Sequence, residues 1–209
     1  WKKLEKYYPT AKNKEEIAAW LWCRTIKCQN PVCESHIPLM ESSTISPKKN
    51  QEIYAIPEFD SKRKRWVGFK LTKEKPKSEN LLKVSRGANF KCPVCNQLSN
   101  EKYIKNESLA GRMGEKLVCL VINTRPRKYI VPDDSQESIA IGAKPKWKIE
   151  IPLPKDNSTI VSGRGYGFNI WSDLFTNRQL LLLTTYVDIL KEIYLTIKEH
   201  SKGDFEYAN

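Results

Sequence analysis

The chain has 209 residues and a formal net charge of +12, which favours a polyanionic partner, with nucleic acid ahead of an anionic membrane surface. A hydrophobic fraction of 40% with six tryptophans indicates a folded protein and excludes a disordered tail. No apolar stretch approaches the roughly 20 residues that cross a bilayer, and no secretory signal is found, so we expect a cytoplasmic protein without a membrane span.

The first half of the chain is predicted to contain a helix and a β-hairpin. Residues 1–27 form the expected N-terminal helical segment, with Asn13 as N-cap and Glu16 completing a capping box. Residues 50–73 contain two apolar runs that flank a turn with four consecutive cations, which predicts a hairpin with a basic tip. This hairpin is the insert of a predicted zinc ribbon at residues 28–105.

The second half is predicted to begin with a small region of strands and loops, residues 106–170. An apolar strand at residues 117–124 is expected to pair with residues 128–131, and a short helix follows at residues 133–141. Residues 144–170 are rich in Pro and Gly, so we expect irregular structure there.

The last predicted element, residues 171–203, is a long amphipathic helix. Thr176 is its expected N-cap, and Gln179 completes a capping box. Apolar residues at alternating spacings of three and four define a seam that we expect to pack against a protein body: Leu180, Leu183, Val187, Leu190, Tyr194 and Ile197. The predicted fold class is therefore α+β, a zinc-ribbon module with short antiparallel hairpins, an N-terminal helix and a long C-terminal helix.

Two close cysteine pairs, Cys28-x4-Cys33 and Cys92-Pro-Val-Cys95, are separated by a long insert. Two such knuckles clamp one tetrahedral zinc ion with thiolates at about 2.3 Å. In the second knuckle the proline favours the turn, and Asn96 tolerates a left-handed backbone. Four thiolates leave no open coordination position, so the predicted zinc is structural rather than catalytic.

Disulfides and inert thiols are the alternatives for these cysteines, and a reducing compartment disfavours disulfides. Redox catalysis by Cys-x-x-Cys would need a thioredoxin-like strand-to-helix context, which the sequence lacks. Cys23 and Cys119 lie outside the knuckles, and Cys119, in an apolar run, is interpreted as a small buried hydrophobe. His36 is interpreted as an ordinary surface or loop histidine, the alternative being that it replaces one thiolate.

No catalytic or cofactor-binding residue is predicted. Only two histidines, His36 and His200, are present, and no G-x4-G-K-[ST] phosphate-binding loop occurs. The Gly-rich residues 163–167 follow a polar, proline-broken stretch instead of an apolar strand. We therefore interpret them as a plain loop and not as a nucleotide-binding turn.

The insert between the knuckles is strongly basic, since residues 60–91 carry eleven lysines and arginines against three acids. Cations on a zinc-stapled hairpin suit contacts with the phosphate backbone of duplex DNA, which carry no base information. The alternative is a solvated run of charge. The residues predicted to contact nucleic acid are Lys62, Arg63, Lys64, Arg65, Arg86, Lys91 and Arg112.

Several separated strings resemble one known family. They are WLWCRTIKC (residues 20–28) with NPVC (30–33) and IPL (37–39), CPVC (92–95), AGRMG (110–114) and WSDLFTNRQL (171–180). In this order they are similar to the middle region of large prokaryotic adenine-specific DNA methylases that carry an N-terminal domain of unknown function. The resemblance covers roughly residues 15–190.

The resemblance implies a parent enzyme that transfers a methyl group from S-adenosylmethionine to an adenine amino group in DNA. In such enzymes a cofactor-binding glycine motif precedes this region and an Asp/Asn-Pro-Pro-Tyr/Phe motif follows it, and this chain contains neither. The resemblance also implies the four cysteines as zinc ligands, and a shared role for Trp171, Asp173, Phe175, Arg178 and Gln179. From the residues themselves we interpret this motif as a helix start, capped by Asp173 or Thr176 and anchored by Trp171 and Phe175.

Two functions are therefore predicted. The leading one is a non-catalytic zinc-binding accessory region of an adenine-specific DNA methyltransferase, which binds duplex DNA beside the remaining methylase domains. The alternative is a zinc-stabilised protein-interaction scaffold, in which the C-terminal helix docks partners or forms oligomers and the cations add solubility. Because the chain begins at Trp1 and ends soon after the long helix, we expect a piece of a larger protein.

Overall fold

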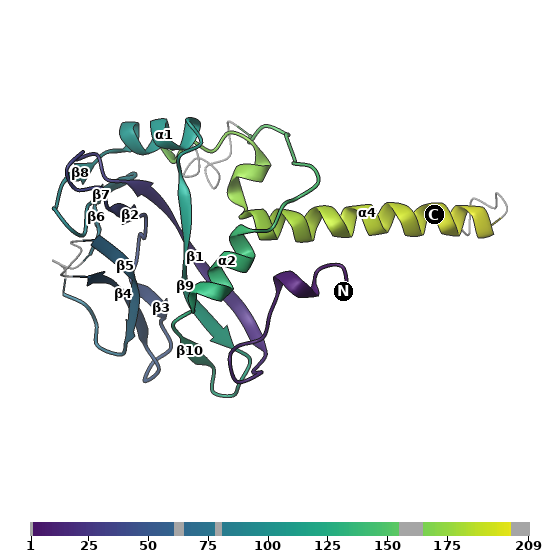
Figure 1. The fold of residues 1–209 in the computed structure, drawn as a ribbon, viewed down its shortest axis with the longest axis horizontal. Helices are drawn as coiled ribbons and strands as arrows, with labels where there is room; N and C mark the ends of the chain where they lie inside the picture. The colour runs from purple at the N-terminus through teal and green to yellow at the C-terminus, as the bar shows by residue number, and fades with distance from the viewer. Residues whose placement is uncertain (1, 61–64, 78–80, 155–164, 202–209) are drawn as a thin grey trace.

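The sequence folds into a mixed α+β structure with three antiparallel sheets (Figure 1). The structure is a computed structural model, and it describes residues 2–60, 65–77, 81–154 and 165–201. Within these ranges three α-helices accompany the sheets, and the C-terminal one is the longest. The predicted α+β class and the long C-terminal helix are confirmed.

The first sheet has the strand order β10-β9-β1-β2. Its centre is the antiparallel pair β1 (Ile17–Lys27) and β9 (Gly114–Ile122), flanked by β10 (Lys128–Ile130) and β2 (His36–Pro38). Residues 117–122 are all buried, because the sheet is covered on both faces. The predicted buried strand and its antiparallel mate are confirmed.

The predicted N-terminal helix is wrong, because residues 17–27 form β1. The spacing of Ile17, Trp20 and Leu21 matches a helical face, yet the segment is also rich in aromatic and β-branched residues that suit a strand. Pairing with β9, almost a hundred residues later, decides the outcome and is invisible to local patterns. Before β1 the only helix in the described residues is the short 3₁₀ helix η1 (Glu5–Tyr7), and Asn13, the expected helix cap, lies in a turn.

The second sheet contains β3 (Thr44–Ser46), β4 (Ile53–Asp60) and β5 (Arg65–Thr72). The β4–β5 pair confirms the predicted hairpin, whose tip at residues 61–64 lies outside the described residues. Ala55 and Phe69 pack with Cys119 of β9, so one face of the hairpin shares a core with the first sheet.

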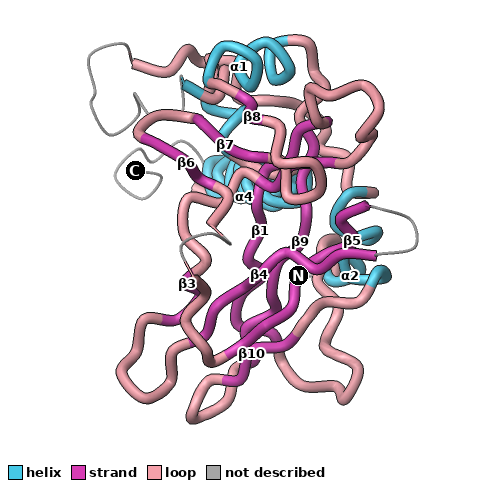
Figure 2. Tube along the Cα trace, turned by 90° about the vertical axis from the view of Figure 1, so that its left-hand side faces the viewer, coloured by secondary structure: helices cyan, strands magenta, loops and turns pink. Residues whose placement is uncertain are grey.

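The third sheet contains β6 (Lys83–Ser85), β7 (Asn89–Lys91) and β8 (Leu98–Ser99). An unpredicted helix, α1 (Glu101–Leu109), follows with Asn100 as N-cap, whose side chain accepts a hydrogen bond from the Tyr103 N–H. In Figure 2 this sheet and α1 lie at one end of the molecule and β10 at the other.

The remaining helices match their predicted starts. Helix α2 (Asp134–Ile141) is capped by Asp133. The 3₁₀ helix η3 (Trp171–Leu174) leads into α4 (Asn177–His200), where Gln179 N–H donates to Thr176 Oγ1 at 3.3 Å and Thr176 N–H donates to Gln179 Oε1 at 2.8 Å. The predicted capping box is therefore confirmed.

Helix α4 is buried only near its start, where Arg178, Leu180, Leu181 and Thr184 pack on the body. Every residue from 191 to 200 is exposed, and the helix projects outward (Figure 1). The expectation that the whole seam is buried against a body is therefore wrong for this chain beyond the first turns.

Candidate metal centre

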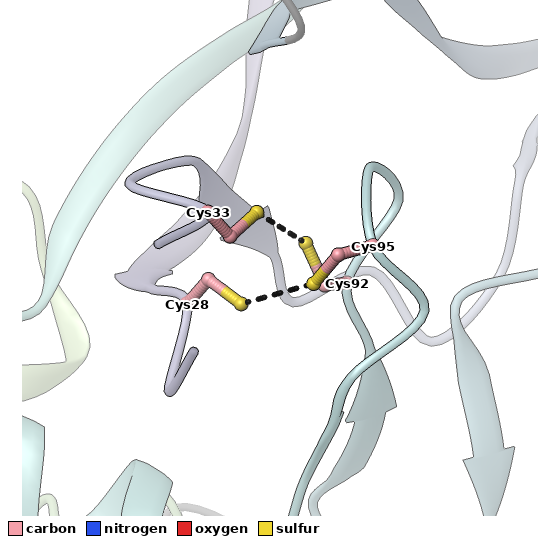
Figure 3. A group of neighbouring side chains, drawn as sticks. All are labelled: Cys28, Cys33, Cys92 and Cys95. Carbon is pink, nitrogen blue, oxygen red and sulfur yellow. Dashed lines mark hydrogen bonds between the residues drawn. The ribbon is translucent and has the colours of Figure 1, made fainter. Parts of the chain in front are cut away.

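Four cysteine side chains converge on one another (Figure 3). The sulfurs of Cys28, Cys33, Cys92 and Cys95 all lie within 4.8 Å of one another. Cys28 Sγ is 3.6 Å from Cys95 Sγ, and Cys33 Sγ is 3.7 Å from Cys92 Sγ. The two predicted pairs, 59 or more residues apart in sequence, therefore form one cluster that can hold a metal ion.

The first knuckle is the loop that joins β1 to β2. Cys28, directly after β1, donates its N–H to the Ser35 carbonyl at 2.7 Å, which continues the hairpin pairing. The Cys33 N–H donates to the Asn30 carbonyl at 3.1 Å, and Asn30 Oδ1 accepts the Val32 N–H at 3.0 Å. An asparagine that bonds the backbone two residues on fixes a tight turn, so both thiols point to the same side.

The second knuckle joins β7 to β8 in a similar way. Cys92 donates its N–H to the Gln97 carbonyl at 2.8 Å and accepts the Asn96 N–H on its own carbonyl at 3.0 Å. Asn96 has a φ of 60°, the left-handed conformation that the sequence predicts for it. The Val94 N–H points at Cys92 Sγ at 3.4 Å and so helps to stabilise a thiolate there.

The sulfur separations distinguish a metal site from a disulfide. A disulfide needs about 2.05 Å between sulfurs, and all four cysteines are free. A tetrahedron of thiolates about 2.3 Å from a central ion has edges of roughly 3.8 Å, close to the observed 3.6 and 3.7 Å. The geometry is thus compatible with zinc.

The pKa values of two of the four thiols in the cluster are raised, whereas that of Cys95 is lowered. Burial raises the pKa of the Cys28 thiol, and burial raises that of Cys92 to about 11. Thiols with raised pKa values stay protonated at neutral pH, and a bound cation reverses this by stabilising thiolates. Cys28 and Cys92 also belong to an apolar cluster with Ile26, Ile37 and Phe90, so a metal ion bound here would be coupled to core packing.

The other candidate ligands lie elsewhere. Cys23 and Cys119 are buried together in the core between the first sheet and the β4–β5 hairpin, as predicted for Cys119. His36 is exposed at the start of β2 and is not in the four-cysteine group, so it does not replace a thiolate there.

The predicted nucleic-acid contacts are only partly visible. Lys62, Arg63 and Lys64 lie outside the described residues, and of Arg65 only the backbone, at the start of β5, is described. Arg86 is exposed in the turn between β6 and β7. Their role in DNA binding stays a prediction.

Lys91 and Arg112 have defined surroundings. Lys91 is half-buried in β7, directly before the second knuckle. Arg112 forms a two-point ion pair with Glu107, with Nε to Oε2 at 2.9 Å and Nη2 to Oε1 at 2.7 Å. Its hydrogen bonds lower the pKa of Glu107, so the Arg112 charge is already compensated inside the chain.

The motif at residues 171–180 anchors α4 to β1. Arg178 is only 3% exposed, and its guanidinium lies 4.8 Å from the Tyr8 ring centroid, 4.6 Å from that of Trp20 and 5.7 Å from that of Trp22. It also donates to the Tyr7 carbonyl at 3.1 Å. A cation enclosed by aromatic faces is held by electrostatic attraction as well as by packing.

Arg24 makes a second link between the same two strings. Its Nη2 donates to the carbonyls of Asp173 at 2.8 Å and Phe175 at 3.1 Å, and its Nη1 lies 3.4 Å from Glu115 Oε2. The Asp173 carboxylate accepts the N–H of Ile170 at 3.1 Å within η3, whereas the cap of α4 is Thr176, the other predicted candidate. Arg24 itself was not predicted, although an arginine inside an apolar run is a signal for a buried partner.

Three of the resemblance strings therefore meet in space. Arg24, Gly111, Met113, Asp173 and Phe175 line one open cavity of about 300 Å³. Arg24 joins two of these strings directly, through its hydrogen bonds to the Asp173 and Phe175 carbonyls.

Comparison with known proteins gives no match, whether to a family model, a curated protein or a solved structure. The resemblance to a methylase region thus stays a prediction. Among the helices that the structure describes, none is both long and apolar enough to span a membrane.

Replacing Cys92 with serine is expected to abolish tight metal binding, because three thiolates remain of four and metal binding is coupled to folding. Metal content after Zn²⁺ loading, together with thermal unfolding, measures this. Cys23→Ser is the matched control, since it removes another buried thiol but leaves the cluster complete. Full metal content and unchanged melting of Cys92→Ser would contradict the assignment.

Replacing Arg178 with methionine is expected to lower the free energy of unfolding by about 2–4 kcal/mol, because a desolvated cation–π contact and a charged hydrogen bond are lost. Denaturant unfolding measures the loss. Lys191→Met is the control, since Lys191 lies over the Trp147 ring at 5.8 Å on an exposed turn and should cost much less. Equal effects of both substitutions would refute the anchoring role.

Proposed function

We propose that this chain is a zinc-stabilised accessory region that grips the phosphate backbone of duplex DNA within an adenine-specific DNA methyltransferase. The zinc assignment is supported by the four-thiolate donor set, because soft thiolates at tetrahedral spacing select zinc among common cellular cations. A complete thiolate shell leaves no position for a reacting water, so the zinc is structural.

One observation carries the DNA-binding part of the proposal. The β4–β5 hairpin, with four consecutive cations in its turn sequence, is inserted between the two knuckles, so the metal centre closes the loop that carries it. Because the two strands that carry this turn are paired with each other, little of their conformational entropy remains to be lost when a polyanion binds. The methylase part of the proposal is supported by the sequence resemblance.

Replacing residues 62–65 with glutamine is expected to weaken duplex DNA binding. It should also make the slope of log K against log salt concentration shallower, by up to about 0.9 per lost phosphate contact. Fluorescence anisotropy of the Zn²⁺-loaded chain with duplex DNA over a range of salt concentrations measures both quantities.

The control for this experiment is a variant with the same charge change elsewhere. Glutamine at Lys2, Lys3, Lys12 and Lys14 removes four exposed cations from the N-terminal segment. If both variants show the same decrease in affinity and in salt dependence, binding depends on net charge and the hairpin is not a specific DNA-binding element. If the unaltered chain does not bind duplex DNA at low salt, the proposal is overturned.

A second candidate function, a protein-interaction scaffold, is favoured by the surface of α4. Its outer turns expose a row of large apolar side chains, with Leu190 64% exposed: Leu183, Val187, Leu190, Tyr194 and Ile197. Contiguous exposed apolar surface on a projecting helix is typical of a docking or oligomerisation face.

Replacing Leu190 with aspartate tests this second function. If the row mediates oligomers, Leu190→Asp should convert them to monomers in sedimentation equilibrium, because a buried carboxylate opposes the interface. Thr196→Asp places the same charge on an exposed site of the same helix outside the row and should have no such effect. A wild-type chain that is monomeric at all concentrations would remove the oligomeric form of this function.

A further inference from the structure

A groove separates the β4–β5 hairpin from the second knuckle. It has a volume of about 460 Å³, within the range of ligand sites. Ile56, Phe59 and Lys70 line it from the hairpin, whereas Lys91, Pro93 and Asn96 line it from β7 and the knuckle. The metal centre therefore holds one wall of the groove, and the basic hairpin forms the other.

The groove combines an exposed aromatic ring with cations. Phe59 is 46% exposed and belongs to none of the buried clusters, so its ring is not used for core packing. Phe59 therefore presents an aromatic side chain to the solvent at the lining of the groove. The register of the β4–β5 pair shifts between Glu58 and Phe59, so Phe59 does not lie on the buried face of its strand.

The charges of the groove suit a nucleotide. Lys70 is exposed on β5. Lys70 attracts phosphate, and Lys91 adds a second positive charge to the lining, whereas apolar Ile56 and Pro93 suit the face of a base. The Glu58 carboxylate also lines the groove and repels phosphate, but it can accept a hydrogen bond from the amino group of a base.

We propose that this groove binds an unpaired nucleotide of a nucleic acid strand, with the base stacked on Phe59 and the phosphate near Lys70 and Lys91. Stacking needs a free base face, so a fully paired duplex cannot use this site. The inference rests on the proposed function for the nucleic-acid class of ligand. The groove would thus bind single strands, in addition to the proposed binding of the duplex backbone by the hairpin tip.

The test compares a short single-stranded oligonucleotide without self-complementarity with the corresponding duplex, both titrated by anisotropy against the Zn²⁺-loaded chain. Phe59→Ala is expected to weaken single-strand binding roughly 5- to 100-fold, the effect of losing one stacked base. Its duplex affinity should stay within about twofold, because phosphate contacts remain. Phe59→Trp should retain single-strand binding.

Val67→Ala is the matched control, since Val67 is similarly exposed, at 42%, on the neighbouring strand and does not line the groove. Single-strand affinity that Phe59→Ala leaves unchanged, or that Val67→Ala lowers equally, would overturn the groove assignment. Duplex binding without single-strand binding by the unaltered chain would also overturn it while the proposed function stands. Single-strand binding without duplex binding would overturn the duplex grip and leave the groove.

Discussion

The antiparallel pairing of β1 with β9 is the interaction on which the rest of the structure depends. Both strands contribute side chains to the two hydrophobic cores, one on each face of the first sheet. At its C-terminal end β1 leads directly into Cys28 of the first knuckle. In its middle, Trp20, Trp22 and Arg24 hold the start of α4. One strand thus connects the core, the metal centre and the projecting helix.

The four-cysteine cluster depends on this strand, and a metal ion bound there would contribute a different constraint. Joining residues 28–33 to residues 92–95 closes a long loop, and the entropy of closure grows only slowly with loop length. A single cross-link can therefore organise the whole insert, including the β4–β5 hairpin and the third sheet. Without the ion, the insert would be held by the small core around Phe90 and by the hairpin packing on Cys119.

The features that could be predicted from sequence are those fixed by nearby residues. The cysteine knuckles, the Asn96 turn, the Asp133 cap and the Thr176–Gln179 capping box all involve partners a few residues apart. Strand β1 could not be predicted, because its apolar spacing fits a helix and only the distant β9 decides for a strand. The aromatic enclosure of Arg178 and the groove beside Phe59 likewise need contacts that span the chain.

Helix α4 presents two faces with different roles. Thr184, Asp188 and Lys191 lie toward the body, where Asp188 accepts the Trp147 indole N–H at 3.2 Å. The exposed apolar row is centred roughly 110° away around the helix, so it is not an unfilled extension of the buried face. Because α4 leaves the body on the side opposite the β4–β5 hairpin (Figures 1 and 2), a partner on this row would not cover the basic insert. The two proposed functions, nucleic-acid binding by the insert and protein docking by α4, are therefore compatible in one molecule.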